Sequence, residues 1–171
     1  MALQRSFGIG KKATQGCPCG FFGHPTRKCN CSLSSIHRYL RKISGPLLDR
    51  IDLQVKVGPV AHQDLMGNAA GEPSEGIAQR VATARRLQIN RQGSVNAALV
   101  PLLLKQYAQL AGTEQEILLE AIQKHQLSAR SYDRILKVAR TIADLAGAKN
   151  IRLPHLSEAI ALRCLDQGYF Q

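Results

Sequence analysis

The sequence predicts a mainly α protein with a small α/β part. From residue 74 onward, apolar residues recur at helical spacing between capping and stop residues. Residues 51–57 instead alternate apolar and polar without an error, which is typical of a strand with one buried face. A hydrophobic content of 44% and a charged content of 20% are those of an ordinary globular protein. The 171 residues suffice for one good core or two small ones.

The N-terminal side is expected to hold a short helix followed by the strand. The hydroxyl of Ser32 can accept from the first-turn amides of a helix over 33–43. A Ser-Gly-Pro sequence at 44–46 ends that helix, and Gly58 with the following proline ends the strand. Residues 61–73 are polar and rich in glycine, which predicts a linker.

Everything after the linker predicts helix. Gly93 ends the first helix, and a capping box from Thr113 to Glu116 is expected to open the third. Ser128 is expected to cap the longest helix, and Pro154 suits the first turn of the last one. The predicted helices cover 74–92 and 101–111, one that opens at 113, then 128–146 and 154–164.

Positive charge is concentrated at the N-terminal end. Residues 1–50 hold nine Lys or Arg and one acidic residue, within a net charge of +11 for the chain. Such a segment attracts polyanions, although a solvated basic surface is an equal alternative. The absence of Trp argues against a platform for stacking single-stranded bases. Neither a long apolar run nor a secretory signal is found, which predicts a cytoplasmic protein without membrane spans.

Four cysteines form a C-x-C pair at Cys17 and Cys19 and a second pair at Cys29 and Cys31. Four thiols in so short a stretch are the ligand set of a closed tetrahedral zinc site. Zinc is the leading interpretation, with unmetallated thiols and disulfides as alternatives and His24 as a substitute ligand. All-sulfur ligation leaves no open position, so the role of such an ion would be structural.

Two arginines occupy positions that favour a function. Arg50 falls between a predicted helix and a predicted buried strand, and Arg130 falls in the first turn of the longest helix. Rigid elements on both sides would hold the Arg50 guanidinium in a fixed place, as the stabilisation of a transferring phosphate requires. The alternative for each is an ordinary solvated or paired arginine.

Three long motifs and the first C-x-C pair together resemble one family. They are CPCG at 17–20, SGPLLDRIDL at 44–53, LSARSYDRILKVARTIADL at 127–145 and HLSEAI at 155–160. The sequence resembles the magnesium-chelatase-like ATPases of the ComM (YifB) type from about residue 16 to residue 166.

The resemblance implies a division of the chain. Residues 16–60 would be the end of an AAA+ P-loop core with its four-cysteine knuckle, 61–73 the linker, and 74–171 an α-helical lid. Because the similarity stops at Gly16, residues 1–15 are expected to be an unassigned tail outside the family sequence.

The resemblance also implies a hexameric AAA+ motor that drives DNA branch migration in natural transformation. Arg50 would be the arginine finger that reaches the γ-phosphate bound by the adjacent subunit. Arg130 would be the sensor-2 arginine of the lid, with Arg134 as the second candidate. ATP, Mg²⁺, neighbouring subunits and DNA are thus the implied cofactors and partners, in the context of the full-length parent.

The chain departs from this family at one important point. It contains neither a Walker A lysine loop nor an acidic Walker B strand, so the nucleotide phosphates and magnesium lack their primary site. We therefore expect no ATP hydrolysis by this chain alone. Two alternatives remain: a stand-alone basic zinc-knuckle DNA-binding module, and an inert remnant with an exposed strand edge.

Overall fold

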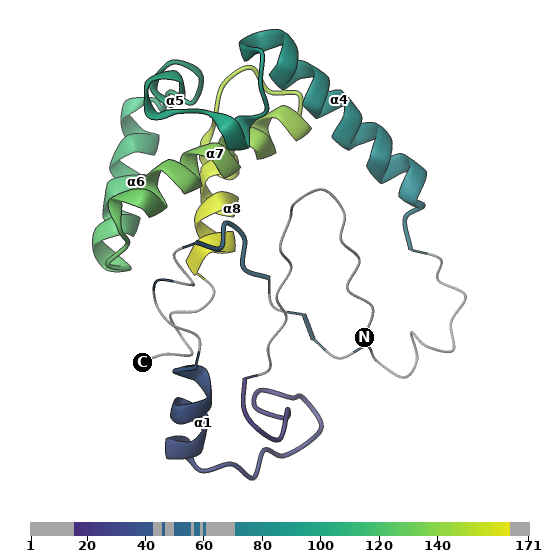
Figure 1. Ribbon diagram of the computed structural model, residues 1–171, viewed down its shortest axis with the longest axis vertical. Helices are drawn as coiled ribbons and strands as arrows, with labels where there is room; N and C mark the ends of the chain where they lie inside the picture. Colours follow the sequence, from purple (N-terminus) through teal and green to yellow (C-terminus); the bar gives the residue numbers. More distant parts are fainter. Residues whose placement is uncertain are drawn as a thin grey trace. The chain divides into compact units, whose positions relative to one another are not determined.

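A computed structural model of the protein describes residues 16–42, 46, 50–55, 57–58, 60 and 71–164. The chain divides into two compact units, one up to Ile43 and one from Ser44 to Tyr169. Within the described residues the secondary structure is helical, which confirms the mainly α fold (Figure 1). The predictions for residues 1–15, for most of the linker and for the last seven residues lie outside the described part.

The first unit holds a single described helix, α1 (Leu33–Leu40). Its N-cap is Ser32, as predicted, and the Ser32 hydroxyl accepts a hydrogen bond from the Ser35 amide at 3.3 Å. Ile36 and Leu40, one turn apart, form its buried face. Because the helix ends at Leu40, it is shorter than the predicted 33–43, and residue 43 lies outside the described part.

The second unit is a helical bundle centred on α7. Its helices are α4 (Ser74–Gln92), α5 (Pro101–Tyr107), α6 (Gly112–Lys124), α7 (Ala129–Leu145) and α8 (Leu153–Cys164), with a 3₁₀ turn at Asn96–Ala98 between α4 and α5. Helix α7 packs against α8, α4, α5 and the 3₁₀ turn, while α6 packs against α8 (Figure 1). The side chains of Leu104, Leu118, Ile135 and Leu156 are fully buried and form the centre of the core.

The ends of α4 and α7 agree with the sequence prediction. Helix α4 ends at Gly93, whose φ of 73° is the left-handed conformation that glycine adopts without steric cost. Helix α7 begins after Ser128, whose hydroxyl accepts from the Ser131 amide at 3.3 Å. Gly147 follows the C-cap of α7 with a φ of 66°. Local capping chemistry therefore fixes the boundaries of the two longest helices.

The predicted capping box at the start of α6 is wrong. Helix α6 begins at Gly112, and the carbonyl of Ala111 accepts the first helical hydrogen bond from Gln115 at 3.0 Å. Thr113 therefore lies inside the first turn, where it cannot act as the N-cap. Helix α5 also ends earlier than predicted, because the backbone leaves the helical conformation at Ala108.

The predicted strand is not found among residues 51–55 and 57–58. Its apolar positions Leu53, Val55 and Val57 are 51%, 68% and 85% exposed, so they bury no common face. The described part of the chain offers this segment no second strand for pairing. The Gln54 amide instead donates to the Leu162 carbonyl of α8 at 2.7 Å. The small α/β part is thus absent from the described structure.

Membrane-spanning helices need both length and high hydropathy. None of the described helices combines the two to the degree that crossing a bilayer requires.

Candidate functional site

The first candidate site is the cysteine cluster. The sulfur atoms of Cys17, Cys19, Cys29 and Cys31 all lie within 4.8 Å of one another. The Sγ–Sγ distances are 3.3 Å for Cys17–Cys19, 3.7 Å for Cys17–Cys29 and 3.5 Å for Cys19–Cys29. A Zn–S bond of about 2.3 Å gives a tetrahedron whose sulfur–sulfur edge is about 3.8 Å. The donor set therefore fits one metal ion.

A tight turn places the first two sulfurs together. The Gly20 amide donates to the Cys17 carbonyl at 3.1 Å, and Gly20 has a φ of 80° that favours glycine. The Phe22 amide then donates to the Cys17 sulfur at 3.3 Å. The turn and this hydrogen bond together fix the Cys17 sulfur beside the sulfur of Cys19.

The thiol pKa values indicate how protons would be distributed in the metal-free cluster. A backbone hydrogen bond from Phe21, together with the neighbouring Cys17 thiol, lowers the pKa of Cys19 to about 6. At Cys29 a backbone hydrogen bond from Cys31 acts in the opposite sense, yet desolvation and the Cys19 and Cys17 thiols raise the pKa to about 12. Four thiolates so close together repel one another, so a cation is needed to hold them all.

The alternative with His24 as a ligand gains no support. Its Nδ1 atom accepts hydrogen bonds from the amides of Thr26 at 3.2 Å and Arg27 at 3.0 Å. This nitrogen thus stabilises the turn between the two cysteine pairs. Among the described residues, the four sulfurs alone form the group of clustered ligand atoms. All four cysteines are free thiols in the structure, so the disulfide alternative is not observed.

The second candidate site is the segment that carries Arg50. The Arg50 side chain is exposed. Its carbonyl, in contrast, accepts a hydrogen bond from the Arg134 guanidinium of α7 at 3.0 Å. Arg134 also forms an ion pair with the carboxylate of Asp52. The segment around Arg50 therefore contacts the helical bundle through Arg134.

Arg130 and Arg134, the two candidates for the lid arginine, have different surroundings. Arg130 lies in the first turn of α7 and its side chain is exposed. Arg134, one turn further on, is 23% exposed at its side chain and is engaged with Asp52 and the Arg50 carbonyl. The exposed position of Arg130 favours it over Arg134 for contact with a ligand.

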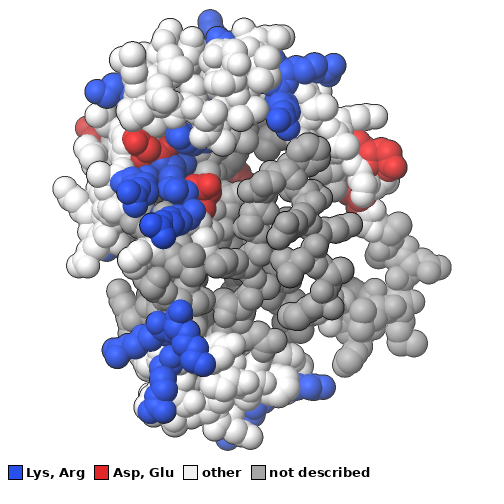
Figure 2. Space-filling model, in the orientation of Figure 1, with Lys and Arg blue, Asp and Glu red and all other residues white. Residues whose placement is uncertain are grey.

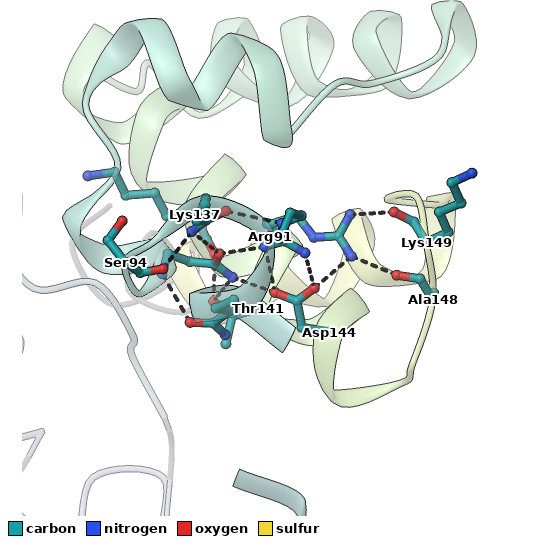
Figure 3. Close-up of polar contacts among 11 residues, drawn as sticks. Arg91, Ser94, Lys137, Thr141, Asp144, Ala148 and Lys149 are labelled. Atoms are coloured by element: carbon teal, nitrogen blue, oxygen red, sulfur yellow. Dashed lines mark hydrogen bonds and ion pairs between the residues drawn. The ribbon is translucent and has the colours of Figure 1, made fainter. Parts of the chain in front are cut away.

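A third group of polar residues, at the junction of α4 with α7, was missed by the sequence reasoning. Asp144 accepts hydrogen bonds from Arg91, Arg140 and Asn96 at 2.6 Å, 2.9 Å and 2.8 Å (Figure 3). Arg140 also donates to the carbonyls of Ala148 and Lys149 beyond the end of α7. The separation of four residues between Arg140 and Asp144 on one helix is a sequence pattern that predicts their ion pair. The network joins elements of the bundle and is structural.

Known proteins with similar sequences define the class of this protein. The profile described as "Magnesium chelatase, subunit ChlI C-terminal" matches residues 71–163, which include nearly the whole helical bundle. The profile described as "Magnesium chelatase, subunit ChlI" matches residues 11–65, which include the cysteine cluster and Arg50. The helical bundle and the segment before it thus both match magnesium-chelatase profiles, which makes this a magnesium-chelatase-like protein.

Individual relatives narrow this class. The Competence protein ComM of Haemophilus influenzae is 40% identical over 146 residues, which are 84% of this chain and 28% of that protein. The uncharacterized protein YifB of Escherichia coli is 38% identical over 140 residues, and an uncharacterized protein of Mycobacterium bovis is 33% identical over 155 residues. These matches cover 80% and 88% of this chain, and 27% and 30% of the respective relative. The chain belongs to the ComM/YifB family of magnesium-chelatase-like proteins.

Proposed function

We propose that this chain supplies the arginine finger and the helical lid of a ComM-like AAA+ motor. In this proposal residues 16–60 complete the ATP-binding core, 61–73 link it to the lid, and 74–171 form the lid. The chain spans between a quarter and a third of the length of the relatives that it matches, so the activity of the whole motor is part of the proposal. DNA branch migration by a hexamer in the cytoplasm is the function that the family resemblance suggests.

The observation that supports this function most directly is the position of Arg50. Its side chain is exposed, while its backbone carbonyl is bound by Arg134 of α7. Phosphoryl transfer requires a guanidinium at a fixed place near the developing charge on the phosphate. A finger that serves a nucleotide on another subunit must also be exposed. The exposure of Arg50 meets the second requirement, and the contact of its carbonyl with Arg134 fixes the backbone from which the guanidinium extends.

Arg130 is proposed to contact the nucleotide from the lid. It lies in the first turn of α7, where the backbone amides and the helix dipole also favour phosphate. The chain lacks Walker motifs, so by itself it is expected to hydrolyse no ATP.

The test uses a chimera with a relative. The matching section of Haemophilus ComM is replaced by this chain, and ATP hydrolysis is measured with Arg50 intact, with Arg50→Lys and with Arg50→Ala. We expect Arg50→Ala to lower the turnover rate by about a thousandfold or more, because a methyl group cannot replace the positive charge. Arg50→Lys should retain part of the rate. The 171-residue chain alone should show no turnover.

A subunit-mixing experiment decides whether Arg50 acts on a neighbour. Chimeric subunits with Arg50→Ala are mixed with subunits whose Walker A lysine is replaced. Activity should reappear in the mixture, because each type supplies what the other lacks at a shared site. Full activity of the Arg50→Ala chimera on its own would refute the proposal.

We further propose that the cysteine cluster binds zinc as a structural ion. The proposal rests on the four clustered sulfurs and on the closed coordination of an all-thiolate site. Free thiols of this kind fit a reducing compartment. The ion would hold Cys17 and Cys19 against Cys29 and Cys31.

A second candidate function, binding to the DNA backbone, is favoured by the charge of the first unit. Residues 16–42 include five Lys or Arg and no acidic residue. The five are Arg27, Lys28, Arg38, Arg41 and Lys42, and all are exposed. In the face seen in Figure 2 this unit shows blue side chains and no red ones. Such a surface is suited to contact phosphates.

This second function is tested by the salt dependence of binding to duplex DNA. Each phosphate contact contributes about −0.9 to the slope of log K against log salt. The variant Arg38→Gln/Arg41→Gln should flatten the slope by about one for each phosphate that is no longer neutralised. Arg85→Gln and Arg86→Gln on α4 together serve as a control of equal charge. An equal change in both variants would show that only net charge matters.

A further inference from the structure

The segment 50–54 is held against the bundle at three points. Arg134 of α7 donates to the Arg50 carbonyl and pairs with the Asp52 carboxylate. The Gln54 amide donates to the Leu162 carbonyl in the last turn of α8 at 2.7 Å. The third point is Arg163 of α8, which donates to the Ile51 carbonyl.

Arg163 also connects the segment to the first half of α7. Its residue is 6% exposed, and its Nη2 atom donates to the hydroxyl of Ser131 at 3.1 Å. Ser131 lies in the first turn of α7, next in sequence to Arg130. One guanidinium thus touches both the segment that carries Arg50 and the turn that carries Arg130.

We infer that Arg134 and Arg163 are positioning residues that make Arg50 move as one body with α7 and α8. A displacement of the first turn of α7 would then carry Arg50 with it. A nucleotide sensed through Arg130 would in this way change the reach of Arg50 toward the next subunit. The inference rests on the proposed function for what the two arginines contact, but the attachment itself does not depend on it.

The exposure of the contacts indicates how firmly the segment is held. The side chain of Arg134 is 23% exposed and that of Asp52 is 60% exposed, so water and salt weaken their ion pair. Arg163 is buried and its contact with the Ile51 carbonyl is partly buried, so water and salt weaken that contact less. We expect the contacts of Arg134 with the segment to break first, while the contact of Arg163 with the Ile51 carbonyl persists.

The Gln54 amide provides a direct probe of the attachment. Its hydrogen exchange is measured by NMR on the full 171-residue chain, without nucleotide, for Arg134→Gln, Asp52→Asn and the double variant. Removing a partly exposed pair should speed exchange at Gln54 about two- to fivefold. The double variant should exchange no faster than Arg134→Gln, because Arg134→Gln already removes the ion pair that Asp52→Asn breaks. Amides in the centre of α7 should be unaffected.

Arg85→Gln on α4 is the control, since Arg85 is likewise a helical arginine of the second unit and its side chain is exposed. It should leave the exchange of Gln54 unchanged. Unchanged exchange in Arg134→Gln and Asp52→Asn would overturn the inference, and so would an equal increase in Arg85→Gln. If Arg134→Gln does not fold, Asp52→Asn decides alone, because Asp52 lies outside the helices.

The two proposals fail in different ways. If Gln54 responds as expected but Arg50→Ala is active in the chimera, the attachment is real and the finger assignment is wrong. If Arg50→Ala is inactive and Gln54 does not respond, Arg50 acts without being positioned by Arg134. In the chimera, Arg134→Gln should lower turnover less than Arg50→Ala does, because it displaces the guanidinium without removing it.

Discussion

Asp144 shows how one residue joins distant parts of the bundle. Its side chain is 2% exposed and faces the guanidinium groups of both Arg91 and Arg140. Burial acts to raise the pKa of the Asp144 carboxyl, but the hydrogen bonds from Arg91 and Asn96 and the charge of Arg140 outweigh burial and lower it. The carboxylate is thus the centre on which α4, the 3₁₀ turn and α7 meet.

Replacing Asp144 by Asn should destabilise the helical bundle strongly. The substitution leaves the buried Arg140 without an opposite charge, and breaking a buried pair from one side costs about 3 kcal/mol or more. Urea unfolding followed by circular dichroism measures the loss. Glu116→Gln on the exposed face of α6 is the control, with an expected change within about 0.5 kcal/mol. Equal stability of both variants would contradict this account.

The same carboxylate makes stability depend on acid. Because the pKa of Asp144 is lower in the folded chain than in the unfolded chain, the stabilisation is complete above the unfolded value of about 3.9. It is lost as the pH falls through the lower, folded value. The free energy of unfolding should therefore fall more steeply between about pH 5 and more acidic pH in the wild type than in Asp144→Asn. Parallel curves would exclude this contribution.

Sequence reasoning could identify only part of this network. Arg140 and Asp144 are separated by four positions on one helix, so their pairing was readable. Arg91 lies 53 positions before Asp144, and no local pattern connects the two. The role of Arg134 was missed for the same reason, since its partner Asp52 is 82 positions away. Contacts that depend on tertiary packing produce no periodic pattern in the sequence.

At the level of elements, capping and stop residues predicted helix ends correctly where the end depends on those residues alone. Ser32 and Ser128 cap α1 and α7, and Gly93 ends α4, because each acts through its own backbone neighbourhood. The prediction of a strand at 51–57 was wrong, because alternating apolar and polar residues indicate only which side chains would share a face. A strand also needs a partner, and the described segment finds a backbone acceptor on α8 instead.

Helix α6 offers a sharp test of which face is buried. Leu118 is completely buried, whereas its neighbour Leu119 is 47% exposed. Leu118→Ala should lower the free energy of unfolding by about 2–5 kcal/mol through poorer packing and the cavity that it leaves. Leu119→Ala has the same chemistry and helix propensity and should cost well under about 1 kcal/mol. Chemical denaturation of both variants measures the difference, and similar losses would show that the packing of α6 is misassigned.

At the level of the whole molecule, the two units are expected to depend on metal differently. Removing zinc with a strong chelator should increase hydrogen exchange in residues 16–42, because four uncompensated thiolates separate. The helical bundle, with its own core, should unfold at the same denaturant concentration as before. Exchange measured by mass spectrometry reports on both units in one experiment.

Cysteine variants provide the control for that experiment. Cys19→Ser removes a clustered ligand and should lose most of the bound zinc, as measured by elemental analysis. Cys164→Ser, at the end of α8, should keep the zinc content of the wild type. Retention of zinc by both variants would place the metal elsewhere. This cluster is the part of the candidate site that the sequence predicted best, because ligand spacing is a local property.

The contacts that hold residues 50–54 have a consequence for variation among related proteins. Arg134 and Arg163 bind the carbonyls of Arg50 and Ile51, and α8 binds the amide of Gln54. Carbonyls belong to every amino acid, so these contacts do not depend on which side chain stands at position 50. Substitutions at position 50 should change the chemistry of the exposed side chain while the backbone stays in the same position. Residue 50 can therefore vary among related proteins without any change in the contacts that hold its backbone.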